Sequence, residues 1–434
     1  MTADRVRKTV LKNGLRVVSE NLPDRDSVTI GVWVEVGSRH EAEGVAGVSH
    51  FLEHMVFKGT PKRSSRELAL AIERLGGTLN AFTSREHTCF HARVLHGDLA
   101  NALDILADLT TQAKIPAPEV IKERRVIAEE IKDAHDTPHE WVHELFWNQL
   151  WPGSAIGRSI AGSIPTVMGL TRRHLADHRR LFYRPDRILI AACGKLSHDR
   201  LVRQARQMFQ FEAASEPAPD IVSPNGVTMR CGVDQRDIKQ THVCLGFPTW
   251  RFADKRRHTT LLTSSLLGGG MSSRLFQSVR EKRGLVYAIY TFSDALYDTG
   301  FFGVYFACDP AQLINATNVI LDEMGRLTRT AVTRAELADT KAQLRGNLLM
   351  GLESIPPRMH RLARHELYLG GHVPAEQTLR SINRIKAADI TAFANEAFRP
   401  DRLAMAVLGP VQSEILTKVA LEKLRPAKRR RKKE

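Results

Sequence analysis

The sequence runs through the same order of segments twice, and this repetition restricts the possible folds more than any other feature. The β-rich segment that begins at Thr29 recurs at Thr241, and the alternating segment 86–94 recurs at 300–308. The helical pattern that follows each alternating segment recurs as well. Two copies of one succession of strands and helices predict two related α+β units, each with a mixed or antiparallel sheet flanked by helices.

A polar stretch separates the two copies. Residues 211–228 include three prolines, a composition that is typical of a linker. The chain has 434 residues, enough for more than one domain with a substantial core. We therefore expect a first domain over 1–210, a second domain over 229–425 and a short basic tail over 426–434.

One segment of the first copy, Gly47-Val-Ser-His-Phe-Leu-Glu-His-Met-Val-Phe57, contains His-x-x-Glu-His. In a helix, His50 and His54 lie one turn apart on the same face, so both imidazoles can bind one metal ion. Glu53 lies between them along the turn, and we expect Ser49 to cap the helix. This order of residues is the inverted zinc-protease signature. The alternative is a polar helix face on which these three residues merely gather.

A catalytic zinc site needs a third protein ligand, and the segment 123–131 offers glutamates for this role. Glu123 and Glu130 are seven residues apart, so they share one face of a helix, whereas Glu129 points elsewhere. We expect Glu130 to be the ligand and Glu123 to be a carboxylate that orients one of the histidines. An ordinary charged helix face is the competing explanation for the same glutamates.

Together these two motifs resemble those of the pitrilysin-type zinc peptidases. The first reads Gly-Val-Ser-His-Phe-Leu-Glu-His-Met-Val-Phe-Lys-Gly-Thr, and the second reads Glu-Arg-Arg-Val-Ile-Ala-Glu-Glu-Ile. Within that family the sequence is most similar to the bacterial processing peptidases and to the β subunit of the mitochondrial processing peptidase. The resemblance extends over nearly the whole chain, and it implies zinc-dependent cleavage of peptides or extended protein segments.

The resemblance assigns roles to individual residues. It implies a single zinc ion per chain, bound by His50, His54 and Glu130. Glu53 takes the place of the family's general base, which accepts a proton from the attacking water. Glu123 takes the place of an accessory carboxylate.

The resemblance also implies that other segments contribute to the substrate site. An arginine–tyrosine pair from the second half of family members falls on Arg280 and Tyr287. The tyrosine hydroxyl could hydrogen-bond the oxyanion of the tetrahedral intermediate, and the arginine could position peptide backbone. An edge strand that takes up the peptide by strand addition falls on Asn80, Ala81 and Phe82.

Glu140 and Glu144 form an acidic pair one helical turn apart. In mitochondrial processing enzymes, acidic residues at similar offsets after the third ligand receive an arginine near the scissile bond. The pair therefore suggests a preference for basic peptides. A solvated helix face is the plainer explanation for two such glutamates, and the sequence leaves both explanations open.

The resemblance further implies how the protein assembles. Family members with two domains pair as subunits, so we expect two domains that face each other across a cavity, and a clamshell-like dimer. The partner is either a second copy of this chain or a related, different subunit. The competing class of function is a non-catalytic scaffold or partner subunit. Such subunits typically lose metal ligands, whereas this chain keeps the whole motif.

Composition argues against several other classes of protein. The sequence has no run of about 18 apolar residues, so no association with a membrane is expected. The five cysteines are scattered and form no C-x-x-C pair, which favours reduced thiols and a cytoplasmic location. The formal net charge is +15, partly because of the tail, but no aromatic residues alternate with the basic residues there. Binding to nucleic acid is therefore not expected.

Overall fold

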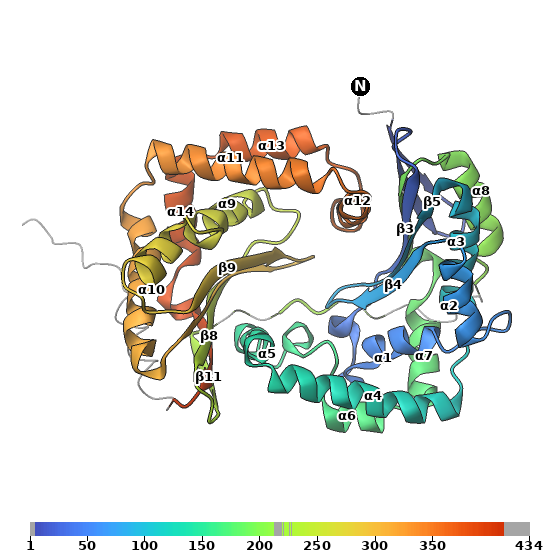
Figure 1. Ribbon diagram of the computed structural model, residues 1–434, viewed down its shortest axis with the longest axis horizontal. Helices are drawn as coiled ribbons and strands as arrows, with labels where there is room; N and C mark the ends of the chain where they lie inside the picture. Colours follow the sequence, from blue (N-terminus) through green and yellow to red (C-terminus); the bar gives the residue numbers. More distant parts are fainter. Residues whose placement is uncertain (1–4, 212–218, 220, 225, 227, 412–434) are drawn as a thin grey trace, which may run out of the picture. The chain divides into compact units, whose positions relative to one another are not determined.

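The computed structural model describes residues 5–211 and 228–411, together with 219, 221–224 and 226. Over these residues the chain forms two β-sheets flanked by helices, which confirms the predicted α+β class (Figure 1). The predicted basic tail 426–434 and most of the predicted linker lie outside the described residues.

The first sheet is a mixed sheet with the strand order β1-β2-β6-β3-β5-β4. Strands β2 and β6 run parallel, and all other neighbours are antiparallel. Gly14, with a φ of 93°, lies in the turn of the β1–β2 hairpin. The strands are β1 (Val6–Val10), β2 (Arg16–Asn21), β3 (Ser27–Val34), β4 (Thr78–Thr83), β5 (Thr88–Leu95) and β6 (Ile188–Gly194).

The second sheet repeats this topology without a counterpart of β1. Its order is β7-β11-β8-β10-β9, and only the first pair is parallel. The same order of pairing in both sheets is the structural form of the sequence repetition. The strands are β7 (Arg230–Gln235), β8 (Thr241–Thr249), β9 (Ala288–Ala295), β10 (Gly300–Cys308) and β11 (Ala404–Gly409).

The helices follow the same repetition. In each half, one helix follows β5 or β10, and a long helix comes directly after it. Those of the first half are α1 (Val48–Val56), α2 (Ser65–Glu73), α3 (Leu99–Gln112), α4 (Ala117–Asp136), α5 (Pro138–Leu150), α6 (Ile164–Gly169), α7 (Arg172–Phe182) and α8 (His198–Met208). Those of the second half are α9 (Arg257–Gly268), α10 (Leu313–Arg329), α11 (Arg334–Gly351), α12 (Ile355–Leu369), α13 (Ala375–Arg384) and α14 (Ala387–Ala397), with a short π-helix at Phe276–Glu281.

Both faces of the first sheet are covered. Figure 1 shows α3 and α8 on one face of this sheet and α12 on the other. The main apolar core includes residues of the sheet and of α1, α3 and α7. A smaller core on the opposite face joins Trp33 of β3 to Met359 of α12.

The helices α5 and α12 are exchanged between the two halves of the sequence. Helix α12 comes from the second half but packs on β6, β3 and β2, whereas α5 comes from the first half and packs on β11, β8 and β7. Phe146 of α5, for example, lies against Phe292 and Phe301 of the second sheet. Each exchanged helix covers the second apolar face of a sheet, which would otherwise be exposed to water.

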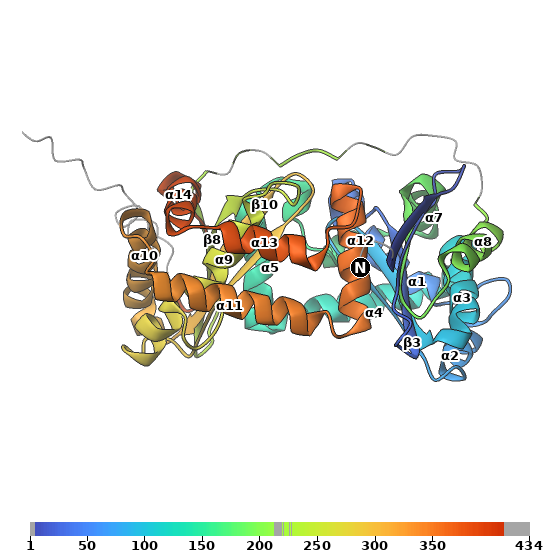
Figure 2. The ribbon, with the colours of Figure 1, turned by 90° about the horizontal axis from the view of Figure 1, so that it is seen from above.

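Because of this exchange, the compact units do not coincide with a single division of the chain. Unit 1 is built from stretches within 1–133, 154–222 and 347–375, and unit 2 from stretches within 134–153, 223–346 and 376–434. In unit 2, α13 runs beside α11 (Figure 2), and the Lys341 ammonium group of α11 donates to the carbonyl oxygen of Ile385. Across the described residues, no helix combines the length and the apolar character that crossing a bilayer requires.

Candidate metal centre

Helix α1 carries the His-x-x-Glu-His motif and begins directly after Gly47. This glycine has a φ of 95°, a conformation that glycine adopts without steric cost. A Cβ atom at Gly47 would lie 2.5 Å from the carbonyl oxygen of Ala161. One side of the helix, including Phe51, Leu52, Met55 and Val56, is buried in the main core. The two histidines therefore remain on the partly exposed side.

The N-terminus of α1 is capped by a residue that precedes it in the sequence. The Glu41 carboxylate accepts hydrogen bonds from the backbone N–H groups of Gly47, at 2.7 Å, and Ser49, at 2.8 Å. The expectation that Ser49 caps the helix is wrong, because the helix begins at Val48 and its N-cap position is Gly47. The Ser49 hydroxyl instead contacts Nε2 of His178 at 3.1 Å. Burial raises the pKa of Glu41 to about 7, although its hydrogen bonds act in the opposite direction.

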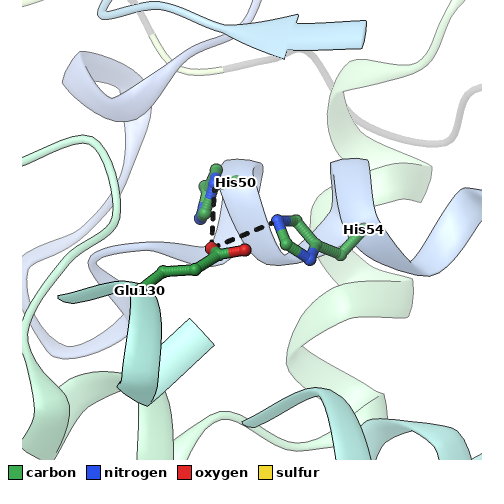
Figure 3. A group of neighbouring side chains, drawn as sticks. All are labelled: His50, His54 and Glu130. Carbon is green, nitrogen blue, oxygen red and sulfur yellow. Dashed lines mark ion pairs between the residues drawn. The ribbon is translucent and has the colours of Figure 1, made fainter. Parts of the chain in front are cut away.

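His50, His54 and Glu130 meet where α4 passes α1 (Figure 3). The Glu130 Oε2 atom lies 3.5 Å from Nε2 of His54 and 3.9 Å from Nε2 of His50. The three ligand atoms all lie within 4.8 Å of one another. Ligands at ~2.1 Å from a tetrahedral metal ion are themselves ~3.4 Å apart. The distance from Glu130 to His54 is close to this value, and the other two would shorten around a shared ion.

The chemistry of these three groups also fits a metal such as zinc. Two imidazoles and one carboxylate are the ligand set of several catalytic zinc sites, which keep a further position open. The Glu130 side chain is 45% exposed, so the group is open to solvent. Burial, with a smaller contribution from His54, lowers the pKa of His50 to about 4. His50 is therefore neutral near pH 7, which is the form that binds metals.

Glu123 contacts one ring nitrogen of His54, and Glu130 faces the other. The Glu123 Oε1 atom lies 3.0 Å from Nδ1 of His54, and a carboxylate can only accept, so Nδ1 carries the proton. The lone pair of His54 is then on Nε2, the atom that faces Glu130. The other carboxylate oxygen of Glu123 pairs with the Lys58 ammonium group at 2.6 Å. The sequence analysis did not single out Lys58, which lies four residues after His54, in the turn that follows α1.

Glu53 lies beside the group of three without being part of it. Its Oε2 atom accepts a hydrogen bond of 2.5 Å from the hydroxyl of Thr83, at the end of β4. Burial raises the pKa of Glu53; the Thr83 hydrogen bond and the nearby His54 lower it, and the charge of Glu130 raises it further. The sequence analysis did not connect Thr83 with Glu53, because the contact joins two segments that are separate in the sequence.

The expected substrate strand is at an edge of the first sheet. Strand β4 ends the strand order, so one of its edges has no strand partner among the described residues. Phe82 packs on the side of the sheet that carries α12, whereas Ala81 packs on the side of the main core. Asn80 is exposed, and its side-chain oxygen accepts a hydrogen bond from the N–H group of Ala81 at 2.8 Å.

The remaining residues that the sequence analysis selected belong to unit 2. Arg280 ends near the ring of Phe276, with its guanidinium carbon 4.8 Å from the ring centre, and Tyr287 is 58% exposed. Glu140 is exposed on α5, 3.9 Å from His139, and Glu144 lies one turn further along. His50, His54 and Glu130 belong to unit 1, so the expected roles of these four residues of unit 2 in the active site stay predictions.

Comparison with known proteins agrees with the class that fold and site define, a two-unit α+β protein with an inverted zinc-peptidase motif. A family model described as insulinase (peptidase family M16) matches residues 16–163. A second, described as the peptidase M16 inactive domain, matches residues 169–344. The chain belongs to peptidase family M16.

Relatives match the chain over almost its full length. An uncharacterized zinc protease of Streptomyces coelicolor is 37% identical over 416 residues, which are 94% of this chain and 90% of the relative. One from Mycobacterium tuberculosis is 40% identical over 410 residues, 93% of each chain. Bacillus subtilis has one that is 35% identical over 405 residues, 93% of this chain and 98% of the relative.

Solved structures with the same fold include three from different organisms. A protease from Helicobacter pylori superimposes with a TM-score of 0.88 at 23% identity, covering 93% of this chain and 99% of the other. A protein from Pseudomonas fluorescens, described as a peptidase M16 inactive domain, gives 0.86 at 19%, covering 94% and 99%. A chain of complex III2 from Candida albicans gives 0.84 at 18%, covering 96% and 99%.

Proposed function

We propose that this protein is a zinc-dependent endopeptidase that cleaves peptides or extended protein segments. The observation that carries the proposal is the convergence of His50, His54 and Glu130 within 4.8 Å. Glu53 lies beside this group, and among the described residues only its Oε2 atom accepts a hydrogen bond. The relatives are named uncharacterized zinc proteases, and these names support the choice of metal.

Each residue of the group has a distinct role in this proposal. His50, His54 and Glu130 hold the metal, and Glu123 keeps His54 in the tautomer that leaves Nε2 free to bind. The chemistry that a bound zinc ion supplies is Lewis acidity, which polarises a carbonyl group and acidifies water near neutral pH. Glu53 takes the proton of the attacking water and later delivers it to the leaving amine.

The substrate contacts in this proposal come from both units. A peptide pairs with the free edge of β4 at Asn80, Ala81 and Phe82, close in sequence to Thr83, which touches Glu53. Arg280 positions the peptide backbone and Tyr287 binds the oxyanion. A further part of the proposal is that Glu140 and Glu144 receive a basic residue of the substrate.

We also propose that the protein works as a dimer in the cytoplasm, with a second copy or a related subunit as its partner. The five cysteines form no disulfide, and four of them are buried, which fits a reducing compartment. The two-domain length fits the subunits that pair in this family.

The experiment that tests the proposal compares the wild type with Glu53→Gln and a control, Glu129→Gln. Zinc content is measured by elemental analysis, and cleavage is followed with a mixed peptide library. We expect about one zinc per chain in all three proteins and cleavage by all except Glu53→Gln. Glu129 is a matched control because it is exposed next to Glu130 and pairs with Lys132. Absence of zinc from the wild type would refute the proposal.

A second candidate function is that of a non-catalytic partner subunit. The match of residues 169–344 to a model described as an inactive domain, and the occurrence of the fold in a complex III2 chain, favour this alternative. It predicts that the wild type alone cleaves no peptide, whether or not it binds zinc. Cleavage that requires an added subunit, and that survives Glu53→Gln, would establish it.

A further inference from the structure

The carboxylate of Glu53 is held at one of its two oxygens. Thr83 Oγ1 is 2.5 Å from Oε2, while Oε1 makes no hydrogen bond with any described residue. A carboxylate that turns freely presents either oxygen, whereas this one is anchored. The contact therefore decides which oxygen of Glu53 is available.

The hydroxyl proton of Thr83 has a single acceptor. Thr83 Oγ1 is also 3.4 Å from Oγ1 of Thr88, but the Thr88 hydroxyl donates its own proton to the carbonyl oxygen of Val36 at 3.0 Å. Each threonine hydroxyl has one proton to donate, and the short distance assigns that of Thr83 to Glu53. The donor thus favours the charged form of the carboxylate at Oε2.

The backbone around Thr83 leaves its hydroxyl little freedom. Thr83 is paired with Thr88 in the ladder between β4 and β5, and both side chains face the side of the sheet where Ala81 enters the main core. The turn that follows is closed by Ser84, whose N–H group bonds the carbonyl oxygen of His87 at 2.8 Å. The Ser84 hydroxyl accepts from the N–H of His87 at 3.0 Å. The hydroxyl is therefore placed by the sheet and not by a mobile loop.

We propose that Thr83 is a positioning residue for the general base: by binding Oε2 of Glu53 it presents Oε1 to the attacking water. This inference rests on the proposed peptidase function. Its physical need lies in the flexibility of the Glu53 side chain, whose carboxylate is hydrogen-bonded, among the described residues, by the Thr83 hydroxyl alone. Without the anchor, the Glu53 carboxylate can rotate away from the metal-binding group. A correctly placed base accelerates catalysis because little reorganisation is left for the transition state.

The experiment compares three variants with the wild type in the metal-loaded protein. Thr83→Val keeps the shape of the side chain but removes the hydroxyl, Thr83→Ser keeps the hydroxyl, and Thr88→Val is the matched control on the paired strand. We expect Thr83→Val to lower kcat about 10- to 100-fold, part of the full effect of a general base. KM and zinc content stay unchanged, and Thr83→Ser recovers most of the activity. Thr88→Val lowers the melting temperature but not kcat.

A second measurement does not depend on activity. In the metal-free protein, Thr83→Val and Glu53→Met are combined in a double-mutant cycle of urea unfolding. We expect the two changes to be coupled, with an unfolding constant that departs at least about threefold from additivity. Additive effects would mean that the hydroxyl and the carboxylate do not interact, which overturns the inference.

The outcomes separate this inference from the proposed function. If the wild type cleaves peptides and Thr83→Val has the same kcat, the inference is wrong and the peptidase function stands. If Thr83→Ser is as inactive as Thr83→Val, the hydroxyl is not the cause and the inference is again wrong. If the wild type binds zinc but cleaves nothing, the proposed function and the inference fall together.

Discussion

The contacts of the Glu123 carboxylate with His54 and Lys58 lead to a prediction about metal affinity. Its two carboxylate oxygens serve two donors, Nδ1–H of His54 at 3.0 Å and the Lys58 ammonium group at 2.6 Å. In Glu123→Gln only one oxygen remains, and the amide nitrogen is itself a donor. The variant can therefore satisfy one of the two groups but places an N–H group against the other.

We expect Glu123→Gln to weaken zinc binding about 10- to 100-fold, as for other residues that orient a metal ligand. This is a loss of about 1.4 to 2.8 kcal/mol of binding free energy. Because Lys58 is partly exposed, its freed ammonium group can turn to water, so the fold should persist.

The assay is a competition titration of the metal-free protein with zinc and a chromophoric chelator at constant pH. Glu129→Gln is the control, since Glu129 lies on the same helix α4 and its exposed carboxylate pairs with Lys132, at 2.7 Å. A folded Glu123→Gln protein with the affinity of the wild type would refute the reasoning.

Three further predictions follow from the fold and its charges. Gly47→Ala should destabilise the protein, because the new methyl group would lie 2.5 Å from a carbonyl oxygen at a φ of 95°; a melting temperature equal to that of the wild type would contradict this. A chain cut within 211–228 should yield fragments that elute together without denaturant, since each half contributes a helix to the other half's sheet; separate elution would count against the exchange. The urea midpoint of the metal-free protein should fall from pH 7 to pH 5, and a flat or rising profile would contradict this. The reason is that burial lowers the pKa of five histidines to about 3 to 4: His40, His50, His87, His143 and His178. Unfolding therefore takes up protons below about pH 6.5, which lowers the free energy of unfolding by about 1.4 kcal/mol per proton and pH unit. Glu41, with its pKa raised to about 7, acts in the opposite direction, but it is a single group against five.

The spacing of residues in the sequence was sufficient to predict the features that lie within one helix or strand. The positions of His50 and His54 on one face follow from the period of the helix, as do those of Glu123 and Glu130. The repeated order of strands was also visible in the sequence, because the segment at Thr29 recurs at Thr241 and the segment 86–94 recurs at 300–308. The proposed role of Glu130 could be predicted because two helical motifs together matched those of a known family.

Contacts between distant segments were decided by the tertiary structure alone. The cap that Glu41 provides, the pairing of Lys58 with Glu123 and the bond from Thr83 to Glu53 each depend on how one backbone packs against another. The exchange of α5 and α12 has the same origin, since either helix could have covered the sheet of its own half. Periodicity in the sequence indicates which face of a helix or strand is apolar. Which other element that face packs against is determined only by the tertiary structure.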